Sequence, residues 1–137
     1  MRAALTSLAT ALAFAAAAPR ASADRGSSAC VLQQYTIGAV APHLEDRHVG
    51  GATTRRVRGA EIFVIAERGL TAEWLRAQID HYRGAHHKES PDCVLDLRGA
   101  DVSVAPRGPG FTVTVRSADD GTAKEILRRA RALRPQS

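Results

Sequence analysis

The segment 61–66, EIFVIA, is the feature that most constrains how this chain can fold. After the first glutamate it contains only β-branched, aromatic or small apolar residues, so an extended chain would be apolar on both faces. This composition is typical of an interior strand that is covered on both sides. We therefore expect residues 61–66 to pair with neighbouring strands and to lie under a layer of helices.

Two helices are expected after this strand. The first follows Thr71, a favourable N-cap residue, and Gly84 is placed to end it in the left-handed conformation. The second follows a cap formed by Ser117 or Asp119. The apolar stripes of these helices are Leu75, Ile79 and Tyr82 in the first, and Ala123, Ile126, Leu127, Ala130 and Leu133 in the second.

Alternating residues predict further strands. Segments 101–105 and 111–116 alternate between apolar and polar side chains and are expected to form a hairpin across a turn at 106–110. Residues 31–40 alternate in part and predict another strand.

Two segments are harder to assign. Residues 41–56 contain Pro42, Gly50 and Gly51 among five charges and predict a long loop or a hairpin excursion. The segment 94–97 is short and mostly apolar, and we expect it to pair briefly with a neighbouring strand.

The resulting order is strand, strand, helix, hairpin, helix, which predicts an α+β fold. We expect a small two-layer sandwich, in which an antiparallel-leaning sheet of about four strands is covered on one face by two helices. A single domain is expected over 31–137, preceded by a flexible N-terminus at 24–30. The side chains expected in its core are Ile62, Val64, Trp74, Leu75, Ile79, Val102, Val104, Phe111, Val113, Val115, Ile126 and Leu127.

Residues 1–23 have the three parts of a secretory signal peptide. Arg2 supplies the positive charge, residues 3–18 form an apolar run, and Ala21-Ser22-Ala23 is a cleavage site of the A-x-A type. The run is too short and too rich in alanine for stable membrane insertion, which needs about 20 strongly apolar residues. We expect an exported bacterial protein, in the periplasm or outside the cell.

Export also decides the state of Cys30 and Cys93, the two cysteines of the chain. Two cysteines in an oxidising compartment usually pair. A bridge between them closes a loop of about 63 residues and contributes roughly 4 kcal/mol in the chain-entropy model. We therefore predict a Cys30–Cys93 disulfide.

The charge pattern and the motifs argue against several function classes. Residues 24–137 contain 17 basic and 14 acidic residues, mixed along the chain, and few aromatic ones, so we expect no nucleic-acid partner. The sequence has no G-x-S-x-G motif and no glycine-rich phosphate loop behind a strand. Its acidic pairs are adjacent and therefore point apart, and we expect no enzymatic activity.

The stretch HYRGAHHKESPDC, residues 81–93, is the candidate metal site. Imidazoles suit zinc, copper or nickel, and His86 and His87 follow the expected helix in a loop that could fold back to His81. The spacing, however, matches no standard zinc pattern, and the disulfide competes for Cys93. His81 also fits a polar position on the flank of the helix's buried stripe.

Two functional hypotheses remain. The first is a small exported, non-enzymatic binding or interaction module without a cofactor, whose partner is an unidentified protein or small ligand. The second is a periplasmic protein that binds a transition metal through the histidine loop 81–87, with His43 or His48 as further ligands.

The mature chain is expected to begin at Asp24 and to contain no free thiol, because cleavage follows Ala23 and the two cysteines pair. Intact mass spectrometry of the exported protein, alkylated without reductant, measures both properties. The expected mass is that of residues 24–137 without alkyl groups. Two alkylated thiols, or retention of residues 1–23, would contradict the prediction.

Overall fold

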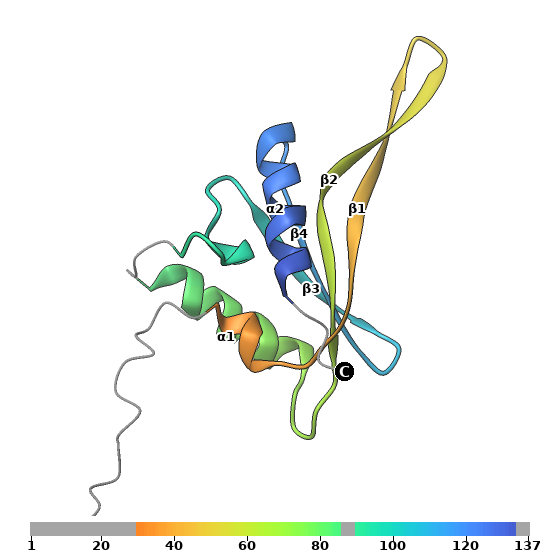
Figure 1. The fold of residues 1–137 in the computed structure, drawn as a ribbon. Helices are drawn as coiled ribbons and strands as arrows, with labels where there is room; N and C mark the ends of the chain where they lie inside the picture. Colours follow the sequence, from red (N-terminus) through yellow and green to blue (C-terminus); the bar gives the residue numbers. More distant parts are fainter. Residues whose placement is uncertain (1–29, 86–89, 134–137) are drawn as a thin grey trace, which may run out of the picture.

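The computed structural model describes residues 30–85 and 90–133, and within these ranges the chain has an α+β fold. Four strands form one antiparallel sheet in the order β1-β2-β4-β3, and the two α-helices lie on one of its faces (Figure 1). The elements are β1 (Ile37–Val49), β2 (Ala52–Ile65), β3 (Asp101–Arg107), β4 (Gly110–Arg116), α1 (Ala72–Gly84), α2 (Asp120–Ala132), and the 3-10 helices η1 (Val31–Gln34) and η2 (Val94–Asp96). The predicted fold class is confirmed.

The core lies between the sheet and its two helices. Successive side chains of a strand point to opposite faces, so the buried residues of β2 and β4 occur at every second position. Helix α2 covers β2, whereas α1 lies beside β3 and the two 3-10 helices. The fully buried side chains include Ala60, Ile62 and Val64 from β2, Val113 and Val115 from β4, Leu75 from α1, and Ala123, Ile126 and Ala130 from α2.

Trp74 was expected in this core, and that prediction is wrong. Its side chain is 57% exposed, whereas the next residue, Leu75, is fully buried. Consecutive helical residues point about 100° apart, so only one of the two can face the sheet. The start of the helix fixes which one, because the Thr71 hydroxyl accepts a hydrogen bond from the backbone N–H of Trp74 and thereby caps α1 as predicted.

The end of α1 also differs from expectation. Gly84 remains within the helix, and the residue that follows it, Ala85, has φ −71°. The N–H of Ala85 donates to the carbonyl of His81, which closes the last turn without a left-handed residue. In α2 the cap is Asp119, whose carboxylate accepts from the N–H of Thr122.

Residues 31–40 are not one strand. Residues 31–34 form η1, held by hydrogen bonds from the N–H of Gln33 to the carbonyl of Cys30 and from Tyr35 to Leu32. Leu32 is fully buried in this turn, and β1 begins only at Ile37.

Residues 41–56 form a hairpin and not a loop. Strands β1 and β2 pair continuously from Leu44 to Val49, and Figure 1 shows this ribbon extending past the rest of the sheet. Gly50 (φ 57°) and Gly51 (φ 82°) connect the strands, and positive φ at both central residues is what a type I′ turn requires. The polar sequence of this ribbon reflects its exposure.

Both outer strands of the sheet contain a proline. Pro42 lies in β1 and Pro106 in β3, and proline offers no N–H to a further strand. On β3 the guanidinium of Arg76 also donates to the carbonyl of Val104, at 2.8 Å. These features protect the sheet edges against the addition of another strand.

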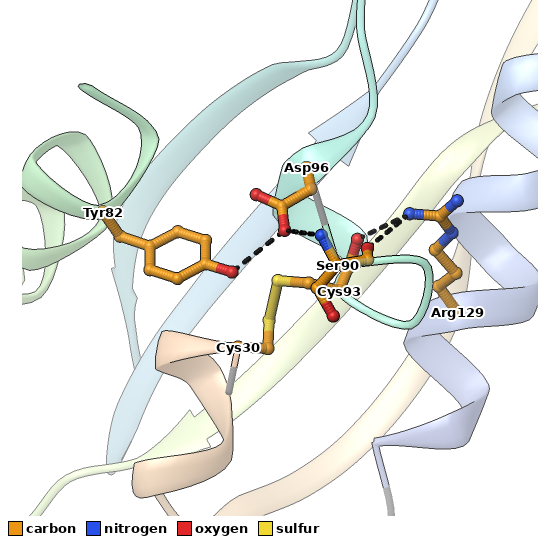
Figure 2. The surroundings of a disulfide bond; sticks show 6 residues. All are labelled: Cys30, Tyr82, Ser90, Cys93, Asp96 and Arg129. Atoms are coloured by element: carbon orange, nitrogen blue, oxygen red, sulfur yellow. Dashed lines mark hydrogen bonds between the residues drawn. A yellow bond between two sulfur atoms is a disulfide. The ribbon is translucent and has the colours of Figure 1, made fainter. Parts of the chain in front are cut away.

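The predicted Cys30–Cys93 disulfide is present and links η1 to the residue before η2 (Figure 2). The carboxylate of Asp96 accepts hydrogen bonds from the Tyr82 hydroxyl at 3.0 Å and from the Ser90 N–H at 2.9 Å. On the other side, Arg129 of α2 donates to the carbonyls of Ser90 and Cys93, at 3.2 and 3.0 Å. These side chains join both helices to the bridge. Residues 94–96 therefore form a 3-10 turn instead of the brief strand expected there.

Replacing Ile126 by alanine is expected to lower the free energy of unfolding by about 2–4 kcal/mol, because its fully buried side chain leaves a cavity. Trp74→Ala is the matched control on an exposed helical position and should cost less than about 1 kcal/mol. Urea denaturation followed by circular dichroism measures both. A larger loss at Trp74 than at Ile126 would mean that the assigned helix faces are wrong.

The Tyr82 hydroxyl is expected to ionise late, because burial and the hydrogen bond to Asp96 raise its pKa to about 12. A pKa that is raised on folding gives a contribution to stability that is complete below about pH 10 and is lost as the pH rises toward 12. Absorbance at 295 nm follows this titration, and Tyr82→Phe should remove the later of the two tyrosine steps. If the step stays in Tyr82→Phe, it belongs to Tyr35.

Candidate functional site

The face of the sheet opposite the helices has apolar residues that no described helix covers. On β2, Glu61, Phe63 and Ile65 alternate with the buried positions and point to this open face, where Ile65 is 39% exposed. The expectation that 61–66 is covered on both sides is therefore wrong. The strand is interior in the sheet, but only one of its faces is in the core.

A hollow of about 490 Å³ lies on this open face. Small-molecule sites typically measure about 300–1,000 Å³ and are mostly apolar. The hollow is formed by β1, β2, β4, the end of β3 and the turn between β3 and β4. Its lining consists of Ala39, Ala41, Glu61, Phe63, Arg107, Gly108, Pro109 and Thr112.

Two glycines make room for the ring of Phe63 in this hollow. A Cβ atom at Gly38 would lie 2.9 Å from Cδ1 of the ring, and one at Gly110 would lie 2.9 Å from Cζ. Real Cβ atoms do not approach other heavy atoms so closely, so a side chain at Gly38 would displace the ring, and one at Gly110 would meet both the ring and the backbone carbonyl of Val64. The ring of Phe63 therefore extends across the sheet from β1 toward β4, as an apolar floor.

Thr112 contributes a buried polar group beside that ring. It pairs directly with Phe63 across β2 and β4, and its residue is only 8% exposed. Among the described residues its Oγ1 atom has no hydrogen-bond partner. A buried polar group left unpaired costs about 1–3 kcal/mol.

The rim of the hollow is ionic. One carboxylate oxygen of Glu61 lies 3.0 Å from Nδ1 of His43, and the other lies 3.5 Å from the guanidinium of Arg107. The side chain of Arg107 is 68% exposed, and among the described residues Glu61 is the partner with which it forms an ion pair. Both oxygens of the single acid at the rim are therefore engaged, while most N–H groups of the guanidinium face solvent.

The ion pairs continue along β1 and β2 away from the hollow. Glu45 lies 3.8 Å from His43 and 3.6 Å from Arg58, and Arg58 in turn lies 2.8 Å from Asp120 of α2. Arg58 is an extra residue at an irregularity of the β1–β2 register, where His43 pairs with Gly59 and Leu44 with Val57. Such exposed pairs are individually worth little, but this series ties the base of the ribbon to α2.

Within the described residues, the structure does not bring the predicted metal ligands together. His81 is exposed in the last turn of α1, and His86 and His87 lie outside the described residues. His43 is at the rim of the hollow, and His48 lies on the ribbon with Nδ1 2.8 Å from the Thr53 hydroxyl. In residues 30–85 and 90–133 no three His, Cys, Asp or Glu side chains are placed to hold a metal ion. A metal site in the histidine loop stays a prediction.

The hollow was not predicted from the sequence, although one signal pointed to it. An interior strand with two apolar faces needs two covering layers, and the chain has only two expected helices, both assigned to one layer. The aromatic residue of the second face, Phe63, was therefore left without a cover. The contributions of Arg107 and Thr112 had no comparable signal, because both depend on strand pairing that sequence spacing does not show.

Comparison with models of known protein families, with curated proteins and with solved structures gave no match. Separately, none of the helices in the described part of the chain has the length and apolar character needed to cross a bilayer.

Thr112→Val is expected to raise the free energy of unfolding by about 1 kcal/mol, because valine has the shape of threonine without the unpaired hydroxyl. Thr114→Val is the matched control, since Thr114 lies two positions further on the same face but does not line the hollow. Chemical denaturation of the three proteins measures the difference. A loss of stability confined to Thr112→Val would show that its hydroxyl is paired in the free protein.

Proposed function

We propose that this protein is an exported, non-enzymatic binding module whose binding site is the hollow on the open face of the sheet. The observation that carries the proposal is the Thr112 hydroxyl, which is buried beside an aromatic floor and has no partner among the described residues. A bound molecule with a polar atom at this point would complete the hydrogen bonding of the hydroxyl. Binding would then recover free energy that the empty fold lacks.

The dimensions and the sheet edges favour a small molecule over a protein strand. A hollow of about 490 Å³ fits a compact organic ligand, whereas stable protein interfaces are much larger and flatter. Partners that add a strand need a free sheet edge. Pro42 and Pro106, together with the Arg76 hydrogen bond to Val104, make the two sheet edges beside the hollow unfavourable for this mode.

The spacing of the polar groups supports binding over catalysis. The contact between His43 and Glu61 resembles that between a catalytic base and the acid that orients it. Nucleophilic catalysis also needs a nucleophile within hydrogen-bond reach of the base. The candidate hydroxyl is that of Thr112, which pairs with Phe63, while His43 pairs with Gly59. The imidazole reaches only as far as Glu61, and β2 lies between β1 and β4, whose backbones are therefore about 10 Å apart at about 4.8 Å per strand. The hydroxyl is therefore out of reach of the imidazole.

Export is supported by the disulfide and by the signal sequence. Disulfides persist in oxidising compartments and are rare in the cytosol. The Cys30–Cys93 bridge is buried and is connected to both helices, so it is an integral part of this fold. Together with the A-x-A site at residues 21–23, it favours a periplasmic or secreted location.

Binding in the hollow is tested with a neutral aromatic probe, 2-naphthalenemethanol, titrated into ¹⁵N-labelled protein. Amide shifts are expected in β2 around Phe63 and in β4 around Thr112, because the ring of the probe should stack on the floor. Ala41→Phe fills the hollow from β1 and should weaken binding at least about tenfold. Ser103→Phe adds the same group to the same face outside the hollow and should leave binding unchanged.

Two results would contradict this function. One is an absence of saturable shifts up to millimolar probe. The other is binding that Ala41→Phe leaves intact, with shifts centred elsewhere on the chain.

A further inference from the structure

The unused hydrogen-bonding capacity around the hollow is mainly on the donor side. Both oxygens of Glu61 are engaged, by His43 and by Arg107. Arg107 has five N–H donors in a fixed fork, and in the described part of the chain it forms a single ion pair, at 3.5 Å. The buried hydroxyl of Thr112 beside the floor has no hydrogen-bond partner among the described residues.

We propose that the ligand of this hollow is an amphipathic monocarboxylate: an apolar ring or short chain that packs on Phe63, with a carboxylate that accepts hydrogen bonds from Arg107 and Thr112. This assignment rests on the proposed function and names the chemical class of its ligand. A planar carboxylate is the group that matches the guanidinium fork with two parallel hydrogen bonds.

Strand register places Arg107 where it can make this contact. Its backbone pairs with Gly110, while its guanidinium meets Glu61, which pairs with Thr114. Thr112 lies between Gly110 and Thr114 on β4, and its side chain is on the same face of the sheet as those of Arg107 and Glu61. The side chains of Arg107 and Glu61 therefore meet beside Thr112. The guanidinium N–H groups of Arg107 that do not contact Glu61 lie on the same part of the face as the Thr112 hydroxyl.

The same arrangement selects against other ligand classes. An ammonium group would have to compete with Arg107 and His43 for Glu61, which is the acid that lines the hollow. A second carboxylate on the ligand would meet either Glu61 or the apolar floor around Phe63. A neutral molecule would pack on the ring but would leave the guanidinium unused.

Three probes with one ring system test the class: 2-naphthoate, 2-naphthalenemethanol and 2-naphthylmethylamine, each titrated into the full mature protein at pH 7 and followed by NMR. We expect 2-naphthoate to bind about tenfold tighter than the alcohol, and the amine to bind no tighter than the alcohol. Arg107→Gln should remove the preference for the carboxylate, so that 2-naphthoate and the alcohol bind this variant with similar affinity. Thr112→Val should reduce that preference in part.

Arg116→Gln is the matched control. Arg116 is an exposed arginine at the end of β4 that does not line the hollow, so its loss should leave the preference intact. Glu61→Gln should strengthen binding of 2-naphthoate, because it removes the competing carboxylate from Arg107 while keeping the shape of the side chain.

The possible failures are distinct. If the alcohol binds in the hollow as tightly as 2-naphthoate, or the amine binds tighter, the carboxylate class is wrong and the hollow remains a binding site. If the preference for the carboxylate persists in Arg107→Gln, the assigned anchor is wrong. If none of the three probes shifts the amides of β2 and β4, both the ligand class and the proposed function fail.

Discussion

Three side chains of one strand, Ala60, Ile62 and Val64, hold the two layers of this domain together. All three are fully buried between β2 and the helix layer, and β1 and β4 pair on either side of the same strand. Because the side chains of a strand alternate, burying these three also determines what the opposite face presents. The position of Phe63 on that face is thus a direct consequence of how the core is packed.

This dependence gives the hollow a rigid base. Phe63 lies between two positions whose burial fixes the backbone, and the adjacent glycines at 38 and 110 leave its ring room across the sheet. Sites built on strands hold their geometry better than sites on loops, since the hydrogen bonds of the sheet restrain each position. Only the rim, where Arg107 lies at the end of β3, has side-chain freedom.

Most of the fold was accessible from sequence, for reasons that are local. The cap at Thr71, the stripe of α2 and the β3–β4 hairpin each follow from spacing within about fifteen residues. The disulfide followed from compartment and from cysteine number. One error has a local cause as well, because Trp74 and Leu75 are adjacent apolar residues that compete for one face. The polar composition of residues 41–56 left a loop and a hairpin open, and the structure shows the hairpin.

The site required information that spacing does not contain. Arg107 and Glu61 are 46 positions apart in the chain and meet only through the pairing of β2, β4 and β3. The unpaired hydroxyl of Thr112 is likewise invisible in the sequence, where alternating threonines in β4 look equivalent. Thr112 is buried and Thr114 is partly exposed because different neighbours flank them in the assembled sheet.

The disulfide also determines how this domain would carry mechanical load. The bridge spans 63 positions, and β1, β2 and α1 all lie inside the loop that it closes. Tension applied through residue 30 and the C-terminal part of the chain would pass across the sulfur atoms to residue 93 and would bypass these three elements. Roughly 210 Å of extended chain, at about 3.3–3.6 Å a residue, would thus remain as hidden length until the bridge is reduced.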